Sequence, residues 1–340
     1  MSLRLYLVRR VGLLVFVLFG VSVLTFVMAR VVPADPAVLY AGAGARGPAI
    51  EQARKILRLD GPLYEQYLGY VSGLAHGDWG TSLRTHRAVL PDILTFLPVT
   101  LELVFSALLL GLLAGVALGA LTADRKGRAI DFVMRIFAVG GVSLPAFFVA
   151  LVFQVLFFRA LNVLPAAGMF SVDVAQNYPV SHVTGAPLLD ALITGNLTAL
   201  SDHLRYMVLP VLALAAYPTG VVMRMSRSAM LESLGQDYIR MARAMGVPRR
   251  TIIYRFALKN SLGPVLTVVG LMLAYAIIGA FFIELIFAWP GIGTYGTMSI
   301  LSLDYPAIMA VTLFVAVIYV VVNLLVDLAI AWLDPRIVLS

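Results

Sequence analysis

The chain contains no cysteine and few charged residues, which make up 13% of its 340 positions. Without cysteine it can form no disulfide, no thiolate metal site and no cysteine nucleophile. A charged fraction this low, beside 61% hydrophobic residues, lies far outside the composition of soluble globular domains. The apolar runs are too long for a soluble core, so a lipid bilayer is the better solvent for them.

Motifs for nucleotide or metal chemistry are also missing. The phosphate-binding loop Gly-x-x-x-x-Gly-Lys-Ser/Thr needs a Gly-Lys pair, and none of Lys55, Lys126 and Lys259 follows glycine. The histidines lack the spacing of a His-Glu-x-x-His site, so we expect all of them to be solvated loop residues: His76, His86, His182 and His203. We therefore expect no catalytic residue, bound cofactor or metal. If the chain moves a solute uphill, the energy must come from another subunit.

Six apolar stretches are long enough to cross a bilayer, and an even number places both termini on one side. They cover roughly residues 11–32, 98–121, 132–158, 204–223, 263–288 and 306–332. The segments on the side of the termini hold 15 Lys and Arg in 64 residues, against 7 in 127 on the other side. Because positive charge marks the cytosolic side, both termini are predicted to be cytoplasmic. The net charge of +7 thus indicates membrane topology rather than nucleic-acid binding.

The first span resembles a signal peptide, but its apolar region is about twenty residues long, so we expect a retained anchor. The outer segment 33–97 is predicted to hold helices at 52–59 and 63–74, then a tight turn from His76 to Ser82 with Trp79 as an interfacial anchor. The outer segment 159–203 has little periodicity and is interpreted as an irregular loop. Ordered helices and the Trp79 anchor are more structure than a connection needs, since most connections are short, so we expect the outer segments to dock a partner, with a simple shielding cap as the alternative.

Prolines and glycines interrupt the inner spans. Pro145 is predicted to break the third span, and Pro210 and Pro218 the fourth. Such breaks fit helices that line a path, and ordinary kinked packing explains them equally well. Small residues recur every four positions at Gly111, Gly115 and Gly119, a pattern of close helix contact that could also face a partner subunit.

Few ionisable residues lie in the spans. Glu102 and Glu284 fall toward the outer ends of their spans and Asp327 toward the inner end of the last, one turn from Asn323. Water and partner groups are close at such ends, so a structural role is favoured over a functional one. Candidates for a translocation path are Pro145, Gln154, Pro218 and Glu284.

The run from Gln236 to Lys259 is a basic helical hairpin between two apolar stretches. Asp237 is predicted to cap its first helix, Gly246 to end it, and Pro248 to restart the chain. The second helix places apolar residues on one face: Ile252, Ile253, Phe256 and Ala257. A folded basic element on the cytosolic side of a membrane is suited to docking a soluble partner.

A series of short motifs then carries a resemblance over essentially the whole chain. The hairpin region reads Arg224-Met-x-Arg-Ser-x-Met-Leu-Glu232, Asp237-Tyr-Ile-Arg-x-Ala-Arg-Ala-x-Gly246 and Ala257-Leu-x-Asn260. The other motifs are Val32-Pro-x-Asp-Pro36, Gly77-Asp-x-Gly-x-Ser82, Thr100-Leu-Glu102, Phe287-x-Trp-Pro-Gly-x-Gly293, Asp304-Tyr-Pro306, Asn323-Leu-Leu-Val-Asp327 and Asp334-Pro-Arg336. In this order they resemble the permease subunits of ABC importers, in the dipeptide/oligopeptide branch. Two departures are Arg240-Met-Ala242, where the general EAA-loop consensus opens with Glu, and Gly263 before Pro264.

The resemblance implies an all-α polytopic membrane protein with six transmembrane helices and a type I ABC importer-like permease fold. Its parts would be 1–32, an extracytoplasmic segment 33–97, and a core 98–340 with a coupling hairpin at about 224–262. The implied coupling residues are Asp237, Tyr238, Arg240, Ala242, Arg243, Ala244, Gly246, Leu258 and Asn260.

The resemblance also implies a set of partners in a bacterial cytoplasmic membrane. These are a second homologous permease, two ATP-binding cassette subunits that hold ATP and Mg, an extracytoplasmic solute-binding protein and membrane lipid. The cargo would be dipeptides or oligopeptides, with nickel, glutathione or haem-like molecules as the alternative. Two rivals are a secondary transporter or channel, which should show deep ion-coupling residues or an internal repeat, and a membrane scaffold that recruits cytosolic proteins.

Overall fold

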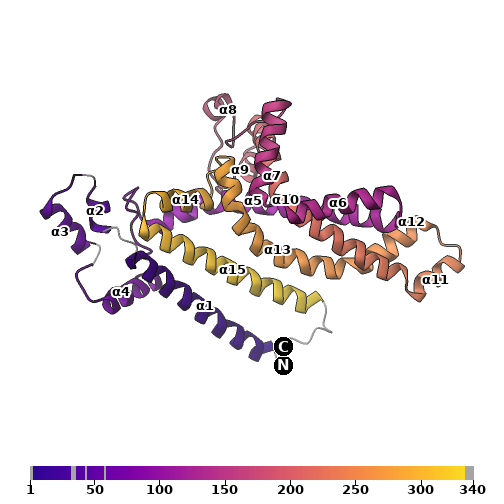
Figure 1. The fold of residues 1–340 in the computed structure, drawn as a ribbon, viewed down its shortest axis with the longest axis horizontal. Helices are drawn as coiled ribbons and strands as arrows, with labels where there is room; N and C mark the ends of the chain where they lie inside the picture. The colour runs from indigo at the N-terminus through magenta and orange to yellow at the C-terminus, as the bar shows by residue number, and fades with distance from the viewer. Residues whose placement is uncertain (1–2, 32–35, 43, 57–58, 334–340) are drawn as a thin grey trace. The chain divides into compact units, whose positions relative to one another are not determined.

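A computed structural model describes residues 3–31, 36–42, 44–56 and 59–333 (Figure 1). Within these ranges the chain is helical, and its sole strand-like pairing is an isolated bridge between Thr81 and Ala88. Four helical segments are long and apolar enough to cross a membrane: Gly12–Arg30, Val89–Asp124, Leu197–Leu234 and Tyr305–Val326. Two bent helix pairs could each supply one more span, giving up to six. The prediction of an all-helical, multi-span chain is confirmed.

The chain divides into two compact units, which we describe separately. The first comprises Met1–Pro98 and Pro290–Leu324, with Arg336–Ser340 outside the described residues. It contains α1 (Leu3–Val31), α2 (Pro36–Ala41), α3 (Gly47–Ile56), α4 (Leu63–Ala75), the start of α5 (Val89–Asp124), α14 (Ile292–Leu301) and most of α15 (Tyr305–Leu333).

Of the helices predicted in the segment 33–97, the one at 63–74 is present as α4, whereas the one at 52–59 begins earlier, as α3, and its residues 57–58 lie outside the described residues. The short helix α2 was not predicted. Pro62 precedes α4 in an extended conformation, and the tight turn that follows α4 places Gly77 and Gly80 at φ of +83° and +88°. Trp79 packs edge-on against Phe314 of α15, with ring centroids 5.8 Å apart. The indole is thus held by another helix of the same unit.

The second unit comprises Val99–Trp289 and Leu325–Pro335. After α5 it contains α6 (Ala129–Ser143), α7 (Ala146–Phe153) with the π-helical turn η1 (Gln154–Ala160), α8 (Val172–Asn177), α9 (Pro187–Ile193) and α10 (Leu197–Leu234). The hairpin follows as α11 (Asp237–Ala244), α12 (Arg249–Thr251) and η2 (Ile252–Ala257), and leads into α13 (Leu258–Ile286).

The three prolines behave differently from one another. Pro145 does break its span, because α6 ends at Ser143, Pro145 is extended before α7, and the chain bends by 111° between the two parts. Pro210 and Pro218 were predicted to break the fourth span, and this is wrong, since α10 runs through both. Both prolines are buried, and neighbouring helices can satisfy the backbone that an interior proline frees.

The glycine strip on α5 packs against α10 of the same chain. A Cβ atom at Gly111, Gly115 or Gly119 would lie 2.8 Å from Pro218, 2.6 Å from Val222 and 2.5 Å from Ser226, respectively. Such distances leave room for hydrogen only, so the strip lets two backbones approach closely. Close helix contact is confirmed, but the suggestion that the strip faces a partner subunit is wrong.

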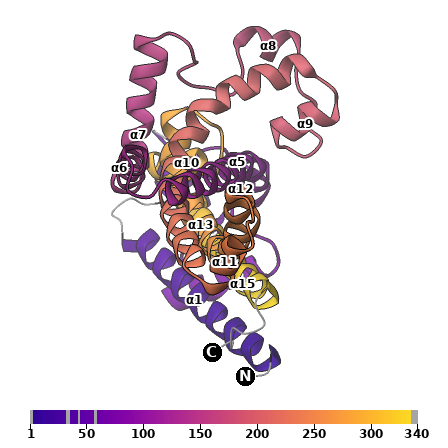
Figure 2. The ribbon, with the colours of Figure 1, turned by 90° about the vertical axis from the view of Figure 1, so that its right-hand side faces the viewer.

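The outer segment 159–203 was interpreted as an irregular loop, which is wrong because α8, α9 and the start of α10 lie in it (Figure 2). Short side-chain caps explain these helices. The Ser171 hydroxyl accepts from the Val174 amide and Asn196 from the Ala199 amide. Asp190 fixes the turn before α9. Burial would raise the pKa of its carboxyl, but hydrogen bonds from Thr184 and Gly185 outweigh it and lower the pKa overall.

Candidate functional site

A buried polar pair joins α5 to α10 in the second unit. His203 is fully buried, and its Nε2 lies 2.6 Å from Oε1 of Glu102, whose Oε2 accepts from the Leu188 amide at 2.7 Å. The His203 ring also packs between Phe170 and Trp289, at centroid distances of 4.9 and 5.3 Å. His203 was expected to be a solvated loop residue, which is wrong, because α10 begins earlier than the apolar run and carries it inside.

Glu284 of α13 is also fully buried, and its carboxylate accepts a hydrogen bond from the Thr100 hydroxyl at 2.6 Å. Glu102 and Glu284 were expected near water at the ends of their spans, but both lie inside the second unit. The motif Thr100-Leu-Glu102 therefore supplies both partners, one for His203 and one for Glu284. The sequence could not show this, because the residues that meet are 101 and 184 positions apart.

A cavity of about 290 Å³ opens at the break between α6 and α7. Pro145 and Pro218 both line it, with Tyr217, Met272 and Tyr275 among the other walls. Gln154 and Glu284 do not line this cavity. The Gln154 amide instead donates to the carbonyls of Ala166 and Ile286, at 2.8 and 3.1 Å. Of the four candidates for the translocation path, Pro145 and Pro218 therefore line the cavity. Gln154 and Glu284 instead form hydrogen bonds within the second unit.

Two distant motifs meet in the first unit. The Asp304 carboxylate accepts from the Ser82 hydroxyl and from the Leu83 amide, the latter at 3.0 Å. A Cβ atom at Gly80 would lie 3.2 Å from Pro306. Contacts between the motifs Gly77-Asp-x-Gly-x-Ser82 and Asp304-Tyr-Pro306 therefore hold the turn after α4 against the start of α15.

The hairpin has its own small core. Ile239, Ala242 and Ile252 are buried together, with Phe256 packed against them. The apolar face predicted for the second helix is divided, because Ile253 and Ala257 are buried in a different cluster. Gly246 ends α11 at φ +74°, the left-handed conformation expected of it. The prediction that Asp237 caps α11 is wrong, because Gln236 is the cap residue and Asp237 begins the helix, where it pairs with Arg240 at 3.0 Å.

The hairpin is also anchored to the helices beside it. Ile253 and Ala257 are buried with Met230 of α10 and with Ala120 and Ala123 at the end of α5, and Leu258 packs against this cluster. The Arg249 guanidinium donates to the carboxylate of Asp124 at 2.9 Å, while the Asn260 amide donates to the Tyr238 hydroxyl at the same distance. The sequence reasoning missed Asp124, whose only signal was its place in a short basic turn.

A second ion pair lies at the same end of the unit. Arg227 of α10 makes two hydrogen bonds to the Asp131 carboxylate of α6, at 2.8 and 3.0 Å. Asp131 is buried and also accepts from the Gly127 amide at 3.0 Å. Paired, two-pronged contacts of this kind fix geometry as well as charge. They link α10, which leads into the hairpin, to α6, which leads to the cavity.

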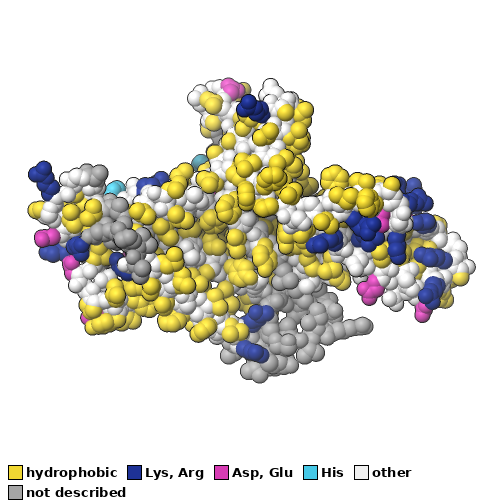
Figure 3. Space-filling model, in the orientation of Figure 1, with side chains coloured by type: hydrophobic (Ala, Val, Ile, Leu, Met, Phe, Trp, Pro, Cys, Tyr) yellow, Lys and Arg dark blue, Asp and Glu magenta, His cyan; other side chains and the backbone are white. Residues whose placement is uncertain are grey.

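The solvent-exposed face of the hairpin contains both basic and apolar side chains. Arg240, Arg243, Ala244, Gly246 and Arg250 are exposed. Met241, Met245 and Tyr254 are exposed as well, at 65%, 73% and 55%. Figure 3 shows the basic side chains gathered at the end that carries α11 and α12. An exposed face of this composition on a folded, anchored element is suited to binding another protein.

No group of three or more His, Asp or Glu side chains among the described residues is placed to hold a metal ion. The side chain of Asp327, and all of Asp334 to Arg336, lie outside the described residues.

Comparison with known proteins gives consistent matches along the chain. Residues 115–339 match the family described as binding-protein-dependent transport system inner membrane component, and residues 3–104 match its N-terminal region. The chain is 48% identical to the probable D,D-dipeptide transport system permease protein of Escherichia coli (strain K12), over 95% of this chain and 94% of that protein. It is 39% identical to the dipeptide transport system permease protein of Alkalihalophilus pseudofirmus and 38% identical to the di/tripeptide transport system permease protein of Pseudomonas aeruginosa, each over 98% of both chains.

Proposed function

Because this chain belongs to the family of binding-protein-dependent transport system inner membrane components, we propose that it carries dipeptides across a bacterial cytoplasmic membrane. The family is that of permease subunits of ABC importers, which are not catalytic, and ATP is hydrolysed by separate subunits. The observation that carries the proposal is the anchored hairpin with an exposed basic and apolar face, in a chain whose relatives are named for peptide transport. The alternative of nickel, glutathione or haem-like cargo is not favoured.

We place the hairpin α11 to η2 on the cytosolic side, where it receives an ATP-binding subunit. Support comes from the density of Lys and Arg, which is highest in the segments that share the side of the hairpin. The exposed side chains of Arg240, Arg243, Met241 and Met245 make the contact, while Ile239, Ala242 and Leu258 hold the hairpin rigid from behind. ATP and Mg belong to the two partner subunits.

The cavity at the α6–α7 break forms part of the translocation path. Pro145 makes the break, and the aromatic walls Tyr217 and Tyr275 can contact peptide groups through ring faces and hydroxyls. The Asp131–Arg227 pair connects this region to the hairpin through α6 and α10. A movement of the hairpin would thereby reach the cavity wall through packed helices.

The partners complete the importer. A second homologous permease shares the path, an extracytoplasmic solute-binding protein delivers the cargo, and the outer segments 33–97 and 159–203 receive it. On α3 the exposed Glu51 and its neighbour Arg54 suit a test of docking, while Arg58 lies outside the described residues.

The test is ATP-driven uptake by the reconstituted complex in liposomes, with L-Ala-L-Ala and D-Ala-D-Ala as separate labelled cargoes. We expect ATPase activity and uptake to require the binding protein, and uptake of at least one of the two dipeptides. Liposomes with this chain as the only permease should be inactive. Uptake without ATP would favour a secondary transporter, and ATPase binding without any uptake would favour a scaffold.

A further inference from the structure

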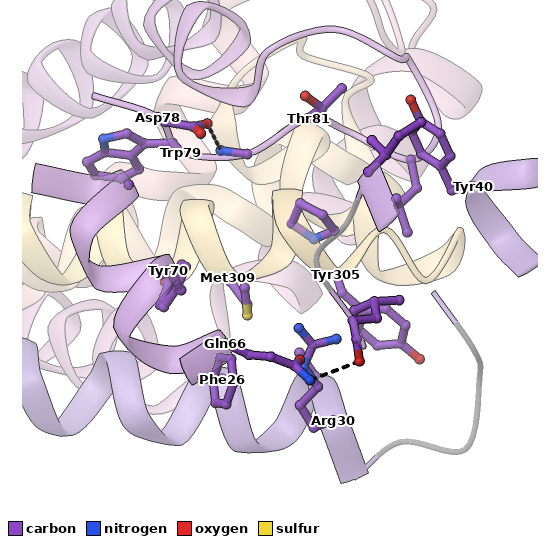
Figure 4. A pocket seen from close by; sticks show the side chains of 18 of the residues that line it. Phe26, Arg30, Tyr40, Gln66, Tyr70, Asp78, Trp79, Thr81, Tyr305 and Met309 are labelled. Carbon is purple, nitrogen blue, oxygen red and sulfur yellow. Dashed lines mark hydrogen bonds between the residues drawn. The ribbon is translucent and has the colours of Figure 1, made fainter. Parts of the chain in front are cut away.

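The first unit contains a pocket of about 550 Å³, distinct from the cavity at the α6–α7 break (Figure 4). Its walls come from the C-terminal end of α1, from α4, from the turn at 78–83 and from the start of α15. None of its lining residues belongs to the cavity at the α6–α7 break or to the hairpin. Its volume is within the range of small-molecule sites.

Four buried polar atoms in this pocket have no hydrogen-bond partner among the described residues. They are Nε of Arg30, Oε1 of Gln66 and the hydroxyls of Tyr70 and Tyr305. Gln66 is held in place, because its Nε2 donates to the carbonyls of Leu59 and Gly61 at 3.1 and 2.7 Å. Arg30 is stacked 5.3 Å over the Phe26 ring. Buried polar groups are nearly always paired, so four without a protein partner in one pocket point to a polar ligand.

The charges of the pocket suit a zwitterion. Arg30 provides a guanidinium, a strong partner for a phosphate, and the hydroxyl of Tyr305, which is 6% exposed, can donate beside it. Three carboxylates also line the pocket: Asp60, Glu65 and Asp78. Figure 4 shows Arg30 rising from the end of α1 toward Met309 with Gln66 beside it, while Asp78 and Trp79 occupy another wall.

The position of the pocket favours a lipid over a soluble zwitterion. Arg30 is the last residue of the apolar span Gly12–Arg30, which is where lipid headgroups lie. Large apolar side chains project from the same two helices, including Phe19 of α1 at 57% and Leu68 of α4 at 63% exposure. These surfaces would accept acyl chains next to a polar headgroup site.

We propose that this pocket binds the headgroup of a phosphoethanolamine phospholipid. The phosphate lies at Arg30 and the Tyr305 hydroxyl, and the ammonium group faces Asp60, Glu65 and Asp78, with Gln66 Oε1 as a further acceptor. The site would fix the outer end of α1 against α4 and α15 within the first unit. This inference stands apart from the choice of cargo and from the role of the hairpin.

The test uses the purified full-length chain with the subunits that copurify, delipidated and titrated with 1-palmitoyl-2-oleoyl phosphatidylethanolamine under native mass spectrometry. Arg30→Gln should weaken retention about tenfold, since it removes a charge-assisted contact. Tyr305→Phe should weaken it by a smaller factor. Arg9→Gln is the matched control, since Arg9 is an exposed arginine of the same helix outside the pocket, and it should leave retention unchanged.

Phosphatidylglycerol with the same acyl chains should be retained less than phosphatidylethanolamine, because it lacks the amine. Copurification of the same subunits and an unchanged melting temperature confirm that a variant is folded. If Arg30→Gln does not fold, Tyr305→Phe, which removes only one hydroxyl, still tests the site. Equal retention by wild type and folded variants, or equal retention of the two lipids, overturns the proposal. Displacement of the lipid by L-Ala-L-Ala overturns it in favour of a peptide site.

Discussion

At the scale of single residues, the buried pair of Glu102 and His203 is held by contacts at both nitrogens of the imidazole ring. The Nδ1 atom of His203 lies 3.1 Å from the Met169 carbonyl, and Nε2 lies 2.6 Å from Glu102. Removing one member of such a buried pair leaves the other without its partner, which is strongly destabilising.

His203→Phe should destabilise the second unit by about 3–5 kcal/mol, because it leaves the Glu102 carboxylate buried with the Leu188 amide alone. The double variant His203→Phe with Glu102→Gln should recover part of this loss, since burying a neutral amide costs less free energy than burying an unpaired carboxylate. His182→Phe, at an exposed histidine of the same outer segment, is the control. The measurement is the unfolding midpoint of the purified protein. Equal midpoints for His203→Phe and His182→Phe would refute the argument that Glu102 and His203 stabilise each other as a buried pair.

Gly115→Ala should destabilise the chain by about 1–3 kcal/mol, because its Cβ would lie 2.6 Å from Val222 and force α5 away from α10. Gly140→Ala is the matched control, since that helical glycine has no atom within 4 Å of the added Cβ. There the change should be neutral or stabilising by up to about 1 kcal/mol. Chemical unfolding in detergent distinguishes the two, and a stable Gly115→Ala would show that the α5–α10 contact can relax.

At the scale of elements, the hairpin has a small core of its own and is packed against the neighbouring helices of the second unit. Ile239, Ala242 and Ile252 form its core, and Ile253 and Ala257 anchor it to α5 and α10. Its solvent-exposed basic face, which includes Arg240 and Arg243, is the surface that we propose contacts a partner. Changes in the turn between the helices should therefore affect docking without unfolding the spans.

Gly246→Val should uncouple transport from ATP hydrolysis, because Gly246 has φ +74°, which a β-branched residue adopts poorly. No neighbouring atom lies within 4 Å of the added Cβ, so the effect is conformational strain in the turn rather than a clash. Uptake in liposomes should fall while the unfolding midpoint of the spans is kept. Gly246→Asn tolerates this conformation better and should retain most uptake; wild-type uptake by Gly246→Val would exclude this role for the turn.

The elements differ in how far the sequence predicted them. The hairpin followed from local signals, since Gly246, Pro248 and the apolar face of η2 act within a few residues of one another. The meeting of Ser82 with Asp304, and of Glu102 with His203, depended on contacts 222 and 101 positions apart, which no local pattern encodes. The continuity of α10 through Pro210 and Pro218 was missed for a similar reason, because packing by other helices overrides a local breaking signal.

At the scale of the whole molecule, the distribution of charge along the chain predicts which segments face the cytosol. The segments grouped with the hairpin carry 15 Lys and Arg in 64 residues, and those grouped with α8 and α9 carry 7 in 127. This bias orients spans during insertion. It makes a prediction about two exposed alanines, Ala244 in the hairpin and Ala175 in α8.

The absence of cysteine makes that prediction directly testable, since any introduced thiol is the only one in the chain. Ala175→Cys should react with a membrane-impermeant maleimide in intact spheroplasts, because α8 belongs to an outer segment. Ala244→Cys should react only after the membrane is permeabilised, because the charge distribution predicts that the hairpin faces the cytosol. Equal labelling of both variants in detergent controls for reactivity, as both alanines lie on exposed parts of short helices. Labelling of Ala244→Cys from outside would reverse the orientation and remove the basis for docking an ATP-binding subunit at the hairpin.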